Sequence, residues 1–146
     1  MRVAGLDVDT KGAHFAVWDG KSAVGVGAMK EREDTRFLTA LRVDVVYIEE
    51  IPYVRNAQTM RKLSQAVGCW KERCEAAGLR VVTIPVSEWK MLAVGNGRAT
   101  KGEVRDTLLM TTDLQLGHPE HIYDAAGIGI AGFQMEKLAG AHPLNS

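Results

Sequence analysis

The sequence predicts an α/β protein with one mixed β-sheet and helices packed on it. The first 29 residues contain three short apolar segments separated by turn sequences, which is typical of antiparallel hairpins. Beyond them, segments with helical periodicity alternate with β-branched segments, a pattern that favours parallel crossovers. A length of 146 residues corresponds to one domain on a prior of roughly 100–200 residues per domain. We therefore expect a single domain over residues 1–146.

The N-terminal part is expected to form an antiparallel meander. Its predicted strands are residues 2–9, 13–19 and 22–29, separated by the turn clusters Asp-Thr-Lys-Gly and Asp-Gly-Lys-Ser. Residues 31–41 have the acidic opening and apolar spacing of a short helix, and residues 43–50 form a strongly β-branched strand. A helix between two strands allows a parallel crossover, so the first and fourth strands can be neighbours.

The clearest helix is expected over residues 56–78. Asn56 is a typical N-cap residue, Gly78 is a typical terminating residue, and apolar side chains recur between them at spacings of three and four. These side chains are Met60, Leu63, Val67, Trp70, Cys74 and Ala77. The stripe can pack on the sheet alone, or it can be shared between the sheet and a second copy of the chain.

The C-terminal half is expected to contain one strand, at residues 80–84, and three helices. The predicted helices run from a cap at Ser87 to about Gly95, from Thr100 to about residue 112, and over roughly 119–138. The last helix contains Gly-Ile-Gly-Ile-Ala-Gly over residues 127–132, which matches a dinucleotide-binding pattern. No strand precedes it and only fourteen residues follow it, so we expect these glycines to let the helix approach the sheet closely.

Composition points to a soluble protein of the cytoplasm. No apolar run approaches the roughly 18 residues that a membrane span needs, and the start of the chain is not typical of a signal peptide. Cys69 and Cys74 are five residues apart on one predicted helix, too far for a disulfide, so we expect both to be reduced and packed.

Charge is distributed unevenly along the chain. Eighteen basic and eighteen acidic side chains give a net charge of zero, but residues 55–105 carry ten basic and four acidic ones. A basic segment of this kind can form a phosphate-binding surface, because the local potential attracts a polyanion. It can equally be a set of solvated helix faces.

Three acidic residues stand in apolar surroundings. Asp7 lies in the first strand, Glu49 near the end of the fourth, and Asp124 in the apolar run of the last helix, one turn after His121. If the first and fourth strands are adjacent, Asp7 and Glu49 meet, and the last helix can bring Asp124 beside them. Converging carboxylates repel unless cations lie between them, and oxygen ligands select Mg²⁺ or Mn²⁺. Each acid also has an ordinary explanation, as a turn, strand-end or helix-start residue.

Two further acids are weaker candidates. Asp9 is expected to be a turn residue, and Glu50 points to the strand face opposite Glu49.

Four motifs in this order resemble the RuvC family of Holliday-junction resolvases, in the RNase H-like nuclease superfamily. Gly5-Leu-Asp7 is similar to the family's opening motif, and the segment from Ile48 to Gly68 to its strand-loop-helix segment with a catalytic glutamate. Pro85 to Val104 resembles a segment that contains two lysines, and His121-Ile-Tyr-Asp124 its last metal-binding motif. The resemblance runs from about residue 3 to residue 133 and implies an RNase H-like fold, a five-stranded mixed sheet with helices on both faces.

The resemblance also implies a function. It predicts a Mg²⁺-dependent endodeoxyribonuclease, with Mn²⁺ able to substitute, that forms a homodimer and resolves branched DNA by paired symmetric nicks. Two ions per site are expected on Asp7, Glu49, Asp124 and His121, with Lys90 and Lys101 acting on the scissile phosphate. Further expected DNA-binding residues are Tyr53, a candidate for stacking on a junction base, and Arg55, Arg61, Lys62 and Arg98. The compact length is closer to that of phage-type members, which places the protein in a bacterial cell or a phage-infected host.

Two alternatives remain open at this point. A related RNase H-like nuclease that acts on ribosomal RNA precursors would share the acids. A non-catalytic junction-binding protein would share the basic segment, although acids near phosphates weaken binding when no metal is present.

Overall fold

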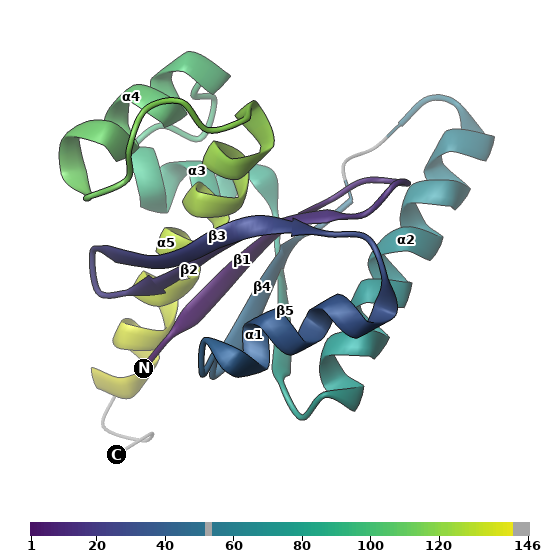
Figure 1. Ribbon diagram of the computed structural model, residues 1–146. Helices are drawn as coiled ribbons and strands as arrows, with labels where there is room; N and C mark the ends of the chain where they lie inside the picture. The colour runs from purple at the N-terminus through teal and green to yellow at the C-terminus, as the bar shows by residue number, and fades with distance from the viewer. Residues whose placement is uncertain (52–53, 142–146) are drawn as a thin grey trace.

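A five-stranded mixed sheet forms the centre of the computed structural model, which describes residues 1–51 and 54–141. The strands are β1 (Val3–Val8), β2 (Ala13–Asp19), β3 (Ser22–Met29), β4 (Val45–Glu49) and β5 (Arg80–Ile84), in the spatial order β3-β2-β1-β4-β5. The three N-terminal strands are antiparallel, whereas β4 is parallel to both β1 and β5 (Figure 1). This arrangement confirms the predicted meander and the predicted neighbourhood of the first and fourth strands.

Helices cover both faces of the sheet, as predicted. The 3₁₀ turn η1 (Arg32–Thr35), α1 (Arg36–Ala40) and α2 (Ala57–Ala76) lie on one side, and α3 (Val86–Val94), α4 (Lys101–Thr111) and α5 (Glu120–Ala141) lie on the other (Figure 1). Each side has its own buried apolar cluster, one around Leu38 and Trp70, the other around Trp18, Trp89 and Ile128. The sheet therefore lies between two cores.

Helix α5 lies unusually close to β1. A Cβ atom added to Gly5 would stand 2.1 Å from the carbonyl oxygen of Ala125 and 2.3 Å from the backbone nitrogen of Gly129. A Cβ on Gly132 would meet the ring of Tyr47 at 2.5 Å. The close approach predicted from the glycines of residues 127–132 is confirmed, and it brings the start of α5 to the end of β1.

Two predicted helix boundaries were wrong. The helix expected over residues 31–41 is split into η1 and the single-turn α1, because the Asp34 side chain accepts hydrogen bonds from the backbone N–H groups of Lys30 and Glu31 and tightens the first turn. Helix α3 is capped by Pro85 instead of Ser87. Pro85 has an extended backbone, and its carbonyl accepts the first helical hydrogen bonds.

The apolar stripe of α2 is only partly used by the core. Trp70 and Cys74 are buried, while Met60, Leu63 and Val67 are half-buried. Cys69 is exposed, so the expectation that both thiols are packed was wrong for it; both are free. The N-terminal half of α2 extends beside the turn between β1 and β2 (Figure 1).

Candidate active site

Asp7 and Glu49 lie side by side where β1 and β4 end. The parallel register pairs Leu6 with Ile48, so the next residues along the two strands are level. Both side chains point to the face covered by α3, α4 and α5, because neighbouring positions of the same parity, Val3 and Val45, belong to the core on that face. The sheet topology thus delivers two carboxylates to one edge of the sheet.

The first turns of α5 add two more ligand groups. His121 Nδ1 is 2.8 Å from Asp7 Oδ2, and Asp124 follows one turn later on the same helix face. One ligand atom from each of Asp7, His121 and Asp124 lies within 4.8 Å of the others. The Asp7 side chain is 17% exposed and that of His121 is 47% exposed, so the cluster is open on one side.

Glu49 stands next to this cluster without joining it. Its Oε1 accepts a 2.9 Å hydrogen bond from the indole nitrogen of Trp89, and its charge acts on both Asp7 and Asp124. The group of three atoms within 4.8 Å does not include it. The structure therefore brings three predicted ligands together and places the fourth beside them.

Burial raises the pKa values of the three acids, and repulsion from Asp7 adds to the rise for Glu49 and Asp124. Burial is the main cause for each of them. The hydrogen bond to Asp7 raises the pKa of His121. A negative charge at this site is therefore costly, and a cation among these groups would offset the cost.

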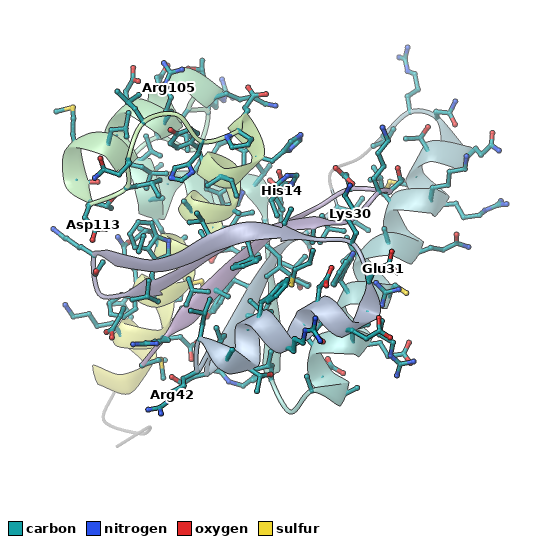
Figure 2. The ribbon with its side chains drawn as sticks, viewed as in Figure 1. His14, Lys30, Glu31, Arg42, Arg105 and Asp113 are labelled. Carbon is teal, nitrogen blue, oxygen red and sulfur yellow. The ribbon has the colours of Figure 1, made fainter. Side chains whose placement is uncertain are left out.

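His14, on β2, lies next to the cluster formed by Asp7, His121 and Asp124. It is paired with Asp7 across the β1–β2 ladder, and its ring stacks on that of His121 with 5.0 Å between centroids and 15° between planes. Its position on the sheet is visible in Figure 2. Within residues 1–51 and 54–141, no group forms a hydrogen bond with its buried Nδ1. Sequence reasoning missed His14, because only the strand pairing reveals that it lies opposite Asp7.

Each of the two predicted lysines lies near one of the acids. Lys90 Nζ lies 5.7 Å from the centre of the Trp89 ring, and its charge offsets part of the rise in the pKa of Glu49. Lys101 Nζ lies 3.5 Å from Glu120 Oε2, and its charge offsets part of the rise in the pKa of Asp124. Each lysine thus stands beside one acid of the site.

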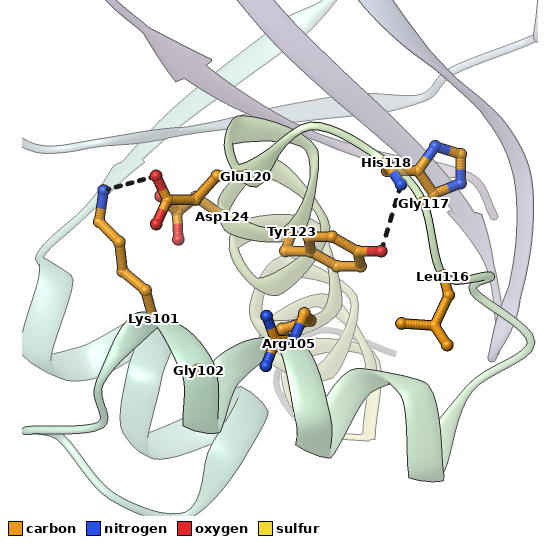
Figure 3. Close-up of a pocket in the computed structure, with 9 residues that line it drawn as sticks. All are labelled: Lys101, Gly102, Arg105, Leu116, Gly117, His118, Glu120, Tyr123 and Asp124. Atoms are coloured by element: carbon orange, nitrogen blue, oxygen red, sulfur yellow. Dashed lines mark hydrogen bonds and ion pairs between the residues drawn. The ribbon is translucent and has the colours of Figure 1, made fainter.

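A hollow of about 280 Å³ opens beside Asp124 (Figure 3). Helix α4 lines it with Lys101 and Arg105, and the segment before α5 with His118. The hydroxyl of buried Tyr123 donates to the Gln115 carbonyl, which fixes that segment. Arg105 and His118 are basic groups near the acids that sequence reasoning did not select, since neither belongs to a recognisable motif.

The remaining predicted DNA-binding residues lie farther along the surface. Arg55, Arg61 and Lys62 are exposed around the start of α2, and Arg98 is exposed in the loop between α3 and α4. Lys62 lines a hollow of about 340 Å³ with Thr10, from the turn after β1. Tyr53 lies outside the described residues. Asp9 is a turn residue, as expected, because its Oδ1 accepts from the N–H groups of Lys11 and Gly12.

The ligand atoms present fit a hard divalent cation. Two carboxylates and one imidazole nitrogen converge, with a third carboxylate adjacent, and oxygen-rich sets of this kind suit Mg²⁺ or Mn²⁺. The candidate ligands come from β1, β4 and α5, so folding alone assembles the site.

Comparison with known proteins identifies the family. The model of the family described as crossover junction endodeoxyribonuclease RuvC matches residues 30–132. This chain belongs to the RuvC family. The matched range contains Glu49, Lys90, Lys101, His121 and Asp124. Strand β1 with Asp7 precedes it, and the parallel pairing with β4 places Asp7 beside the matched residues.

Curated RuvC proteins are similar over part of their length. The crossover junction endodeoxyribonuclease RuvC of Syntrophomonas wolfei is 30% identical over 109 residues, which cover 74% of this chain and 63% of the relative. The RuvC protein of Shewanella frigidimarina is 30% identical over 96 residues, 66% of this chain and 56% of the relative. The chain thus spans about 60% of the length of these relatives.

Solved RuvC and resolvase structures share the fold. Thermus thermophilus RuvC in complex with a Holliday junction substrate has a TM-score of 0.84 at 21% identity, covering 94% of this chain and 96% of that one. The fowlpox virus resolvase with Holliday junction DNA has a TM-score of 0.60 at 15% identity, covering 94% and 99%. The RNase H-like architecture expected from the sequence is therefore confirmed. No helix in residues 1–51 and 54–141 is long and apolar enough to cross a bilayer.

Proposed function

We propose that this protein is a metal-dependent endodeoxyribonuclease that resolves Holliday junctions or other branched DNA. The observation that carries this proposal is the convergence of Asp7, His121 and Asp124, with Glu49 beside them, at the sheet edge of a RuvC-family fold. Two solved structures with this fold, T. thermophilus RuvC and the fowlpox resolvase, are complexes with Holliday junctions.

Asp7, Glu49, Asp124 and His121 would hold Mg²⁺, with Mn²⁺ able to substitute and two ions per site. Bound cations of this type lower the pKa of a water and offset charge on a phosphodiester. The chain's own part is to keep the carboxylates converged on a partly buried edge of the sheet. Burial there favours the protonated carboxyl groups, and a bound cation would favour the ionised ones.

The lysines would bind the substrate phosphate. The charge of Lys101 acts on Asp124 and that of Lys90 on Glu49, so both lysines are close enough to the acids to offset the charge that would develop on the scissile phosphate. Arg98 and the exposed cations around the start of α2, Arg55, Arg61 and Lys62, would bind flanking backbone phosphates. Tyr53 is proposed to stack on a junction base.

We further propose that the active form is a homodimer. Paired nicks in opposite strands of a junction require two sites related by a two-fold axis. The half-buried Met60, Leu63 and Val67 on α2 offer an apolar surface that the core leaves incompletely covered. The same DNA-processing role implies a cytoplasmic location.

The deciding experiment is a cleavage assay on a synthetic four-way junction with Mg²⁺, Mn²⁺ or EDTA, with the nick positions mapped on all strands. We expect symmetric nicks in opposing strands with either metal and none with EDTA. Cleavage of structured RNA in place of the junction would assign the protein to the RNA-processing alternative. Junction binding without cleavage in either metal would make it a binding protein.

The predicted ligands are tested by replacing carboxylates with amides of the same shape. Asp7→Asn, Glu49→Gln and Asp124→Asn are each expected to lower the rate of nicking by at least about 100-fold. Each change removes an ionised carboxylate that would hold the metal which stabilises the charge on the phosphate. Junction binding in EDTA should persist or strengthen, since a negative charge near the phosphates is lost. Nicking at the normal rate by Asp7→Asn would contradict the proposed site.

A further inference from the structure

Trp89 joins the interior of the protein to a predicted metal ligand. The residue lies on α3 and is 1% exposed, and its indole nitrogen donates the 2.9 Å hydrogen bond to Glu49 Oε1. A buried indole N–H requires an acceptor, and most of the ring here packs in the apolar cluster between the sheet and α5. The hydrogen bond therefore ties the Glu49 carboxylate to a rigid part of the core.

Glu49 needs such an anchor because its neighbours repel it. The charges of Asp7 and Asp124 both act against the ionised Glu49 carboxylate. Glu49 is the last residue of β4, so its side chain has solvent on one side. A bond from the indole to Oε1 restrains the carboxylate and leaves Oε2 available to a cation.

The position of the indole is set in turn by α5. A Cβ atom added to Gly127 would lie 2.5 Å from Cζ3 of Trp89, so the absence of a side chain at this position makes room for the ring. Gly127 is on the helix that carries His121 and Asp124. Helix α5 thus supplies two predicted ligands and also seats the residue that holds a third.

We propose that Trp89 is a positioning residue that holds the Glu49 carboxylate toward the metal site, and that Gly127 seats its ring. The inference deepens the proposed function and rests on it for the role of Glu49. It extends the functional set to two residues that touch no predicted substrate atom. An outer hydrogen bond to a ligand of this kind is typically worth 10–100-fold in metal affinity or activity.

The first test measures Mn²⁺ binding by calorimetry on the isolated protein, together with Mn²⁺-dependent nicking of the junction. Trp89→Phe keeps a buried aromatic ring and removes the N–H donor. We expect about 10–100-fold weaker Mn²⁺ binding or an equal loss in kcat, with junction affinity in EDTA unchanged. Gly127→Ala, which displaces the ring without altering it, is expected to reproduce the defect.

Trp18→Phe is the matched control. Trp18 belongs to the same apolar cluster, and its indole nitrogen also donates a 2.9 Å hydrogen bond, but to the carbonyl of Ala126. We expect Trp18→Phe to lower the melting temperature and to leave Mn²⁺ affinity and kcat near wild-type values. An equal loss of Mn²⁺ affinity and kcat in both tryptophan variants would mean general loosening of the core and would overturn the proposal.

A double-mutant cycle with Glu49→Gln separates positioning from stability. If Trp89 acts through Glu49, then Trp89→Phe causes no further loss of Mn²⁺ affinity or kcat in the Glu49→Gln background. Fully additive losses would refute the inference. A wild-type protein that binds Mn²⁺ but cuts no junction would sink the proposed function, and the Mn²⁺-binding cycle would still decide the role of Trp89.

Discussion

At the level of single residues, the ionised carboxylates at the sheet edge lower the free energy of unfolding of the metal-free protein. Asp7, Glu49 and Asp124 all have raised pKa values, caused first by burial. A carboxyl group whose pKa is higher in the folded state favours the unfolded chain whenever it is ionised. Below its ordinary pKa both states hold the proton and there is no penalty. Above the ordinary pKa the unfolded chain ionises first, so the penalty grows from there until the pH exceeds the raised value.

The first prediction concerns Asp124→Asn. An asparagine cannot ionise, so the variant should melt at a higher temperature than the wild type at pH 7 in EDTA, and the difference should vanish toward pH 3. Added Mg²⁺ should raise the melting temperature of the wild type more than that of the variant. Differential scanning calorimetry across pH measures both effects.

Asp106→Asn is the control for this prediction. Asp106 is on the exposed side of α4 and pairs with Arg105, so its replacement should change the melting temperature little. A metal-free Asp124→Asn protein that is less stable than the wild type at pH 7 would show that the carboxylate stabilises the fold, contrary to this account.

At the level of elements, the contact between α5 and β1 decides whether the site forms. The two backbones approach at Gly5 and Gly129 with no room for a side chain between them. This contact carries the start of α5 to the end of β1, where His121 reaches Asp7. The two glycines therefore allow the close approach that brings the ligands together, although neither glycine is a ligand.

The second prediction compares two glycine substitutions by chemical denaturation. Gly5→Ala should destabilise the fold by about 3 kcal/mol, because the new Cβ meets backbone atoms of α5 that cannot move independently. Gly68→Ala is the matched control, since Gly68 lies inside α2 with nothing within 4 Å of a Cβ. It should stabilise the protein by about 0.5–1 kcal/mol. Equal effects of the two changes would contradict the close packing.

At the level of the whole molecule, zero net charge conceals a strong asymmetry. The segment 55–105 holds ten of the eighteen basic residues and four of the eighteen acidic ones. In the structure, Arg61 and Lys62 project from α2, and Lys62 shares a hollow with the turn after β1. Lys62 therefore lies next to the turn that follows β1, the strand that carries Asp7.

The third prediction is a steep salt dependence of junction binding in EDTA. The logarithm of the affinity should fall linearly with the logarithm of the salt concentration, and Lys62→Ala should reduce the slope by about 0.9 if it contacts one phosphate of duplex DNA. Lys30→Ala, an exposed lysine before η1, should leave the slope unchanged. Fluorescence anisotropy at several salt concentrations measures the slopes, and equal slopes for all three proteins would remove Lys62 from the interface.

The fourth prediction concerns assembly. If α2 forms the dimer contact, sedimentation at micromolar concentration should give a dimer, and Leu63→Glu should shift it to a monomer with an unchanged far-ultraviolet circular dichroism spectrum. Ser64→Glu, at an exposed neighbouring position, is the control. A wild-type monomer at these concentrations would contradict paired cleavage by a preformed dimer.

The sequence alone determined the order of elements and the fold class. Alternating apolar residues, β-branched segments and capping residues are local signals, so the strands and the long helices were predictable near their observed ends. The sequence led us to expect Asp7, Glu49 and Asp124 to converge, and the resemblance to RuvC proteins added His121. In the structure Asp7, His121 and Asp124 lie together, and Glu49 stands beside them.

Only the tertiary structure decided how the site is supported. His14 lies beside His121 through strand pairing, and Trp89 holds Glu49 from a helix forty residues away in the chain. The tight turn at η1 and the Pro85 cap depended on individual hydrogen bonds that periodicity does not encode. Contacts between distant segments arise from packing geometry, which a linear pattern of residue types does not specify.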